Sequence, residues 1–189
     1  MGGTGPFGRA LAMRLHAAGD DVVLGSRDRA RAKEAAAELG VEGAVNEVSV
    51  RGVELVVLAT NAGAMLETAR ALPLAAPALS VASELRSDEP VSLAERLAEA
   101  VDVPILAGLH SLAAGKLSDE PPDEDAFVCG DHADAKAKAL ELAQKLVRGR
   151  AVDAGPLRSA RGLEAMTGVL VGINRRYKIH AGLRVTGLR

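Results

Sequence analysis

The chain is poor in the residues that would tie it to a disulfide framework, a nucleic acid or a membrane. It has one cysteine, Cys129, which cannot close an internal disulfide, and this favours a reduced, cytoplasmic setting. Its formal net charge is -2, and no basic stripe of the kind that binds nucleic acid is present. The longest apolar run, residues 71–82, is too short for a bilayer span and contains two prolines. We therefore expect neither a nucleic acid nor a membrane among its partners.

Aromatic residues are also scarce, at 2% of a chain that is 48% hydrophobic and 25% charged. The core must therefore be built from alanine, valine, leucine and isoleucine. A length of 189 residues suits one domain with a sizeable core, which we place over residues 1–189. The four histidines lie in unrelated contexts, and a single cysteine gives no zinc-binding spacing, so we expect no metal site.

Short apolar runs alternate with amphipathic stretches along the whole chain. The apolar runs predict buried strands, and the stretches between them predict helices, for which Asp28, Asn61 and Asp131 are candidate N-caps. Strands are expected at residues 21–26, 53–60, 78–83, 103–109, 126–130 and 150–155, and helices at residues 8–19, 29–40, 62–72, 91–101, 132–149 and 159–177. This alternation predicts an α/β fold: a doubly wound, Rossmann-type parallel sheet, completed by a C-terminal helix over residues 159–177.

A glycine-rich loop opens the chain. Gly3, Gly5 and Gly8 fit the pattern G-x-G-x-x-G, ahead of an amphipathic helix and a buried strand. In this pattern Gly3 permits a tight turn, Gly5 lets the backbone approach a pyrophosphate, and Gly8 lets the helix pack close to the sheet. A purely structural turn would match the pattern as well, but the helix and strand that follow favour a dinucleotide site.

The first strand of such a sheet is not visible in the sequence. It should lie in the middle of the sheet and lead directly into the loop, yet only Met1 precedes Gly2. Its omission would leave unpaired backbone groups and an exposed apolar slot. A start site further upstream, a strand from another chain and a defective protein are the three explanations, and we favour the first.

The residues after the second strand of the pattern select between NAD and NADP. NAD-binding chains usually carry an acidic residue there, whereas an arginine accommodates the 2′-phosphate of NADP. Ser26 and Arg27 stand at this point and suit a phosphate dianion. We interpret Asp28 as a helix cap and Arg29 as a solvated helix charge, whereas both interpretations stay open for Arg31.

The glycine loop "GGTGPFG" and the "SRD" after the strand resemble the NADPH-dependent reductases of the deazaflavin coenzyme F420. The loop type also occurs in NADPH domains of membrane ferric reductases. Three later segments resemble the F420 group more specifically, so that the resemblance runs over residues 2–188: "FVCGDHADAKAKA", "VDAGPLRSARGLEAMTG" and "INRRYKIHAGLRVTGL".

The resemblance implies a cytoplasmic oxidoreductase that transfers a hydride between C4 of the nicotinamide and C5 of F420. The two rings would stack with these carbons roughly 3–3.5 Å apart. The cofactors supply the chemistry, and the protein supplies position and electrostatics. A reductase of another acceptor, such as a flavin, a ferric chelate or an imine, and a non-catalytic NADP-binding module are the alternatives.

Resemblance also implies which residues hold the cofactors. Residues 4–7 would face the pyrophosphate, and residues 26, 27 and 31 would face the 2′-phosphate. Residues 60 and 62 would border the nicotinamide, and residues 112 and 114 would line the pocket. The full set of cofactor-binding positions is Gly3, Thr4, Gly5, Pro6, Phe7, Gly8, Ser26, Arg27, Arg31, Thr60, Ala62, Leu112 and Ala114. Relatives often have a bulkier, proline-containing turn where this chain has "TNAG" at residues 60–63.

Three residues are the expected catalytic group. His110 follows a predicted strand, where it could bind a cofactor ring or simply complete the strand end. By resemblance, Arg161 would meet an anionic or carbonyl group of F420, and Thr167 a ring-edge group; without the resemblance, Arg161 would be a surface charge. Three interpretations stay open for the basic segment 174–184: it binds the phosphodiester and glutamate tail of F420, it forms a dimer contact, or it is a solvated helix end. The apolar C-terminal helix could bury against a second copy, which makes a homodimer our expectation, or against its own sheet.

Overall fold

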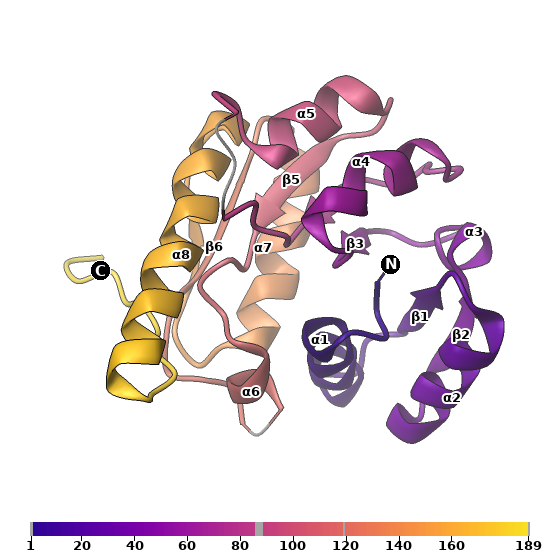
Figure 1. Cartoon of the computed structure of the whole chain (residues 1–189), viewed down its shortest axis with the longest axis horizontal. Helices are drawn as coiled ribbons and strands as arrows, with labels where there is room; N and C mark the ends of the chain where they lie inside the picture. Colours follow the sequence, from indigo (N-terminus) through magenta and orange to yellow (C-terminus); the bar gives the residue numbers. More distant parts are fainter. Residues whose placement is uncertain (1, 86–88, 119, 189) are drawn as a thin grey trace.

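Two β-sheets form the framework of the computed structural model, which describes residues 2–85, 89–118 and 120–188 (Figure 1). The smaller sheet pairs β1 (Val23–Ser26) with β2 (Glu42–Val45). The larger sheet has the order β3 (Val56–Leu58), β4 (Ala78–Ser80), β5 (Ile105–Gly108), β6 (Ala126–Gly130) and β7 (Ala151–Asp153). The predicted α/β fold is confirmed, and no described strand lies between β1 and β3, where the first strand was expected.

Among the described strands, β5 and β6 are the one antiparallel pair. Leu106 lies opposite Gly130, and Gly108 opposite Val128, whereas the other four pairings are parallel. Between β5 and β6 the chain forms only the short helix α6 (Ala114–Leu117). A parallel crossover needs a dozen or more residues that return along the sheet, usually as a long helix. This segment makes no such return, so β6 starts at the edge where β5 ends, and the sheet departs here from the all-parallel expectation.

The helices match the prediction in order and differ at some ends. The longer ones are α1 (Pro6–Ala17), α2 (Arg29–Leu39), α4 (Ala62–Arg70), α5 (Leu93–Ala100), α7 (Ala133–Leu146) and α8 (Ala160–Tyr177). The short α3 (Asn46–Ser49), α6 and the 3-10 turn η1 (Leu157–Ser159) were not predicted. Helix α1 starts two residues earlier than expected because proline fits the first helical position.

The predicted N-caps are confirmed at two of three helices. The Asp28 carboxylate accepts hydrogen bonds from the amides of Ala30 and Arg31, and the Asn61 side chain accepts one from Gly63. The prediction for Asp131 is wrong. His132 occupies the N-cap position of α7, and the Asp131 carboxylate instead accepts a hydrogen bond from the Leu157 amide at the start of η1. Asp131 therefore ties the loop after β6 to the segment that leads into α8.

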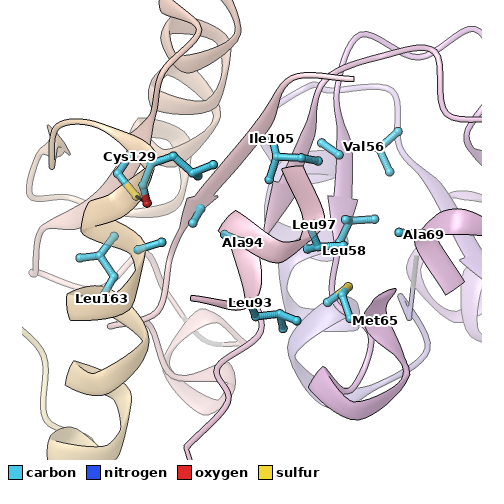
Figure 2. Packing of buried hydrophobic residues seen from close by; sticks show 14 of the residues in the cluster. Val56, Leu58, Met65, Ala69, Leu93, Ala94, Leu97, Ile105, Cys129 and Leu163 are labelled. Carbon is cyan, nitrogen blue, oxygen red and sulfur yellow. Dashed lines mark hydrogen bonds between the residues drawn. The ribbon is translucent and has the colours of Figure 1, made fainter. Parts of the chain in front are cut away.

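The core of the larger sheet has two faces. On one face, Val56, Leu58 and Ile105 meet Met65 of α4, residues of α5 and Leu163 of α8 (Figure 2). On the other face, α1 and α7 cover the sheet. The smaller sheet has a much thinner core, which consists of Ala12, Leu24, Ala35 and Ala36. Within the described ranges, no helix combines the length and apolar character that a membrane crossing requires.

Candidate active site

The glycine loop turns between the carboxyl ends of β1 and β3. The Gly3 amide donates to the Gly25 carbonyl at 3.2 Å, and the Gly5 amide to the Gly2 carbonyl at 3.2 Å. Gly2 has a φ of 65°, and a Cβ on it would lie 2.6 Å from the Ala59 oxygen. The left-handed turn that only glycine adopts easily therefore lies at Gly2, one residue before the position that the motif predicted.

Gly8 and Gly5 differ in what an added side chain would meet. A Cβ on Gly8 would lie 2.6 Å from the Gly3 Cα, because α1 packs directly on the loop. A Cβ on Gly5 would have only an ordinary contact of 3.5 Å with the Gly2 oxygen. Gly5 is the N-cap of α1 and provides no side-chain cap, so that the first amides of this helix are left for an anion.

A hydroxyl and guanidinium groups mark the end of β1. The Ser26 side chain is buried, and its Oγ accepts a hydrogen bond from the Asp28 amide at 3.3 Å. Arg27 and Arg31 are exposed, as is Arg29, and the Asp28 carboxylate is occupied as the cap of α2. The end of β1 therefore offers hydrogen-bond donors to an anion, while the nearest carboxylate faces the helix amides.

His110 lies at the end of β5 with one ring nitrogen bonded and the other bare. Its Nε2 is 3.1 Å from the Ala82 carbonyl, which requires the proton on Nε2, while the buried Nδ1 has no hydrogen-bond partner within the described ranges. Burial lowers the pKa of His110 to about 4, against the smaller opposing effect of the Ala82 hydrogen bond. The imidazole is thus neutral near pH 7, and Nδ1 is a hydrogen-bond acceptor. The preceding Leu109 has a φ of 64°, a conformation that leucine rarely adopts.

Thr167 joins α8 to the loops after β4 and β5. Its Oγ1 donates to the His110 carbonyl at 3.0 Å and lies 2.7 Å from the Ser83 Oγ. Since the Thr167 proton is used toward His110, Ser83 is the donor in the second bond. The structure therefore brings two expected residues, His110 and Thr167, together with a strand-end serine that had no assigned role.

Arg161 lies next to a residue that sequence reasoning missed. Glu164, one helical turn further along α8, is buried, and its carboxylate is 3.4 Å from the amides of Leu93 and Ala94 at the start of α5. Burial raises the pKa of Glu164, while these amides and the Arg161 charge act against the rise. The i, i+3 spacing of the two residues was the available signal. Arg161 thus belongs with Glu164 in the part of α8 that contacts α5.

The remaining expected residues lie around the same edge. Thr60 follows β3, and its buried Oγ1 has no hydrogen-bond partner among the described residues. Ala62 begins α4 and Ala114 begins α6, and Leu112 is buried in the core that α1 and α7 cover. Phe7 packs against that core as well, although its place on the loop suggested a ligand contact. In the described part of the chain, no three His, Cys, Asp or Glu side chains gather as metal ligands.

Two buried atoms without a hydrogen-bond partner in the described part of the chain, Thr60 Oγ1 and His110 Nδ1, thus lie at the carboxyl ends of strands, as do the glycine loop and Ser26. Parallel α/β sheets bind ligands at the carboxyl ends of their strands. The loop leaves room on the side of Gly5, and β1 ends in cationic side chains. This donor set fits a dinucleotide with an additional phosphate, and the bare imidazole nitrogen fits a ring that presents an N–H group.

Comparison with known proteins agrees with this geometry. The family model described as NADP oxidoreductase, coenzyme F420-dependent, matches residues 1–83. An F420-dependent NADP reductase from Methanothermobacter thermautotrophicus is 32% identical over 222 residues, which cover 100% of this chain and 94% of that protein.

Solved structures share the fold. A candidate F420-dependent NADP reductase from Arthrobacter sp. FB24 superposes with a TM-score of 0.83 at 22% identity, over 96% of each chain. A reductive aminase from Aspergillus terreus, solved with NADPH, reaches 0.70 at 18% identity, over 93% of this chain and 60% of its own. With a full-length relative above 30% identity, the chain belongs to the family of F420-dependent NADP oxidoreductases.

Proposed function

We propose that the protein is an NADPH-dependent F420 reductase, which transfers a hydride between NADP(H) and coenzyme F420. The observation that carries the proposal is the side of the molecule at the carboxyl ends of β1, β3 and β5, which has two different ends. A glycine loop and basic residues lie at β1, and the neutral imidazole of His110, whose backbone carbonyl accepts a hydrogen bond from α8, lies at β5. When bound together, the two cofactors supply the hydride donor and the hydride acceptor. The role of the chain is therefore to hold and orient them.

At the first end, the loop residues Thr4 to Phe7 and the amino end of α1 would hold the pyrophosphate. Ser26, Arg27 and Arg31 would hold the 2′-phosphate, because charge-assisted hydrogen bonds to a dianion are stronger than neutral ones. Arg27 and Arg31 are exposed, so that a phosphate can reach them without breaking a buried pair. Thr60 Oγ1 and Ala62 would border the nicotinamide.

At the second end, His110 Nδ1 would accept a hydrogen bond from a ring N–H of F420. The Ala82 carbonyl keeps the proton on Nε2, and Thr167 holds the His110 backbone, so the acceptor is fixed before the ligand arrives. Leu112 and Ala114 would line the ring pocket. Arg161 would contribute positive charge at the start of α8, where it lies close enough to Glu164 to oppose the rise in the pKa of that carboxyl.

Three further properties belong to this proposal. The basic end of α8, with Arg175, Arg176 and Lys178, would attract the phosphodiester and glutamate tail of F420. A second copy would cover the apolar side chains that α8 exposes, since Val169 is 63% and Val171 40% exposed. The free, buried thiol of Cys129 suits a reducing cytoplasm.

The test is a spectrophotometric assay of the purified chain with NADPH and oxidised F420, with NADH as the control donor. Flavin, ferric chelate and imine are the control acceptors. We expect F420 reduction with NADPH and little with NADH. Reduction of a control acceptor in place of F420 would establish another reductase, and tight NADPH binding without reduction of any acceptor would establish a binding module.

A further inference from the structure

Helix α6 has only four residues, and distant parts of the chain hold it in place. A helix this short is not stable by its own hydrogen bonds, so its position depends on what it contacts. Arg14 of α1 donates from Nε to the Leu117 carbonyl at 2.7 Å, and the Leu117 side chain is fully buried. A Cβ on Gly115 would lie 3.6 Å from the His180 ring. Helix α6 is therefore enclosed by α1 on one side and by the segment after α8 on another.

A further contact of α6 is an ion pair inside the protein. Lys116 of α6 pairs through Nζ with Glu124 Oε2 at 2.6 Å. The Glu124 side chain is only 2% exposed, whereas that of Lys116 is 26% exposed. Among the described residues, Lys116 is the only hydrogen-bond partner of this carboxylate, because the buried Oε1 has none. Loss of either member would therefore leave the other charge without its partner.

The segment that follows α8 passes directly over this ion pair. A Cβ on Gly182 would overlap Glu124 Oε2 and would lie 2.9 Å from Lys116 Nζ. The Asp125 amide donates to the Leu183 carbonyl at 2.7 Å, which fixes the segment beside the pair. The backbone at Gly182 thus covers the pair and leaves no space for a side chain. Shielding from water strengthens the attraction between the two charges.

The same helix carries part of the proposed deazaflavin pocket. Ala114 is the first residue of α6, and Leu112 precedes it by two residues. His110 begins the same stretch of chain, but its backbone carbonyl is held separately by Thr167 of α8. A displacement of α6 would therefore move Leu112 and Ala114 relative to His110.

We propose that Lys116 and Glu124 are positioning residues of the deazaflavin pocket: their covered ion pair fixes α6 and, through it, holds Leu112 and Ala114 in place against His110. This inference rests on the proposed function. The pair acts through α6 and not by contact with the ring. Its loss should impair the use of F420 and spare NADPH, because the proposed NADPH site at β1 and the glycine loop does not include α6.

Two substitutions test the pair in different ways, each with a matched control. Glu124→Gln keeps the shape of the side chain and removes its charge. Glu120→Gln is the control, because the pair of Glu120 and Arg148 precedes the same strand and is exposed. Gly182→Ala keeps both charges and displaces the carboxylate, so it tests the contact without an unpaired charge. Gly172→Ala is its control, because a Cβ there would meet nothing within 4 Å among the described residues.

The readouts are kcat/KM for F420, the Kd for NADPH by calorimetry, and hydrogen exchange of the amides of residues 116–118, which are hydrogen bonded within α6. All are measured well below the Tm of each variant. We expect Glu124→Gln and Gly182→Ala to lower kcat/KM for F420 by about 10- to 100-fold, because a small misplacement of a reacting group has effects of this size. Exchange of the α6 amides should become at least about 10-fold faster, whereas the Kd for NADPH should stay within about 2-fold. Both controls should match the unaltered chain in all three measurements.

Values of kcat/KM for F420 that stay within about 2-fold of the unaltered chain would overturn the proposal. So would an equal loss of NADPH binding, which would show a general loss of structure, and so would α6 amides that exchange at the unaltered rate. If the unaltered chain bound NADPH but did not reduce F420, the proposed function would fail instead. The exchange rates would then still show whether the ion pair fixes α6.

Discussion

The two ends of the candidate site are built in different ways. The end that we propose to bind phosphate rests on a two-stranded sheet with a core of four small or medium side chains, and it offers loop amides and exposed cations. At the end that we propose to bind the deazaflavin, side chains of α8 are hydrogen bonded to backbone groups of distant elements. The partners of Thr167 and Glu164 there lie 57 and 71 residues away. A local motif thus builds the first end, whereas the second end depends on contacts between distant elements.

The largest effect on stability and NADPH binding is expected at the glycine loop. Gly8→Ala places a methyl group 2.6 Å from Gly3 Cα, so α1 must move away from the loop. We expect the free energy of unfolding to fall by about 2–3 kcal/mol and NADPH binding to be lost. Calorimetry and urea unfolding measure both.

Gly5→Ala is the matched control, because its methyl group meets only an ordinary contact within the protein. It should change the free energy of unfolding by less than about 1 kcal/mol, yet weaken NADPH binding by blocking the approach of the pyrophosphate. If Gly8→Ala bound NADPH as well as the unaltered chain, the assignment of the loop would be wrong.

An effect of similar size is expected far from the loop, where Asp125 holds the C-terminal segment. The buried carboxylate accepts hydrogen bonds from the Arg150 and Val185 amides and pairs with the Arg150 guanidinium at 3.0 Å. Asp125→Asn should lower the free energy of unfolding by about 3 kcal/mol at pH 7. The exposed pair of Asp123 and Arg184 provides the control, and Asp123→Asn should cost less than about 1 kcal/mol.

The ionisation of Asp125 should also make the free energy of unfolding depend on pH. Burial alone would raise the pKa of Asp125, but its hydrogen bonds and the Arg150 charge lower it from 3.8 to about 2. Because the folded pKa lies below the unfolded one, its stabilisation is complete above about pH 4 and is lost as the pH falls toward 2. Urea unfolding should show the difference between the unaltered chain and Asp125→Asn shrinking over that range. A constant difference would contradict the assigned ion pair.

The sequence predicted the local structure of the helices and strands far better than the contacts between distant elements. Alternating apolar runs and the caps at Asp28 and Asn61 depend on neighbouring residues, so they could be inferred from short windows. β2 was missed because four residues that include a glutamate and a glycine carry no strand pattern. The reversal of β6 depends on the path of the chain after β5, and the contacts of Thr167 and Glu164 depend on how α8 lies across the sheet. No local pattern encodes either of these.

A smaller effect would sharpen the assignment of the phosphate end. Arg27→Ala should weaken NADPH binding about 10- to 100-fold, since a hydrogen bond to a charged group contributes about 1.5–3 kcal/mol. NADH binding should not change. Arg29→Ala removes a guanidinium from the first residue of α2, which we interpret as a solvated charge, and should leave both affinities within about 2-fold. Equal effects of the two substitutions on NADPH would show a general charge effect without a 2′-phosphate site.

The smallest effect is expected at His110. Its pKa of about 4 keeps it neutral between pH 5 and 8, so its imidazole signals should not titrate in that range by NMR. Because the folded pKa lies below the usual 6.5, burial of this ring costs stability progressively as the pH falls from 6.5 to 4. His110→Gln should remove that part of the acid sensitivity. A titration of His110 near pH 6.5 would contradict the neutral acceptor at the deazaflavin end.

Direct transfer between the two ends is the central claim, and an isotope measurement tests it. NADPH that carries deuterium at both C4 positions is incubated with the chain and oxidised F420 in ordinary water, and the reduced F420 is analysed by mass spectrometry. We expect one deuterium in each reduced F420 molecule, because the hydride passes from one cofactor to the other without exchange with solvent. Reduced F420 without deuterium, or NADPH that stays unoxidised while it is bound, would contradict it.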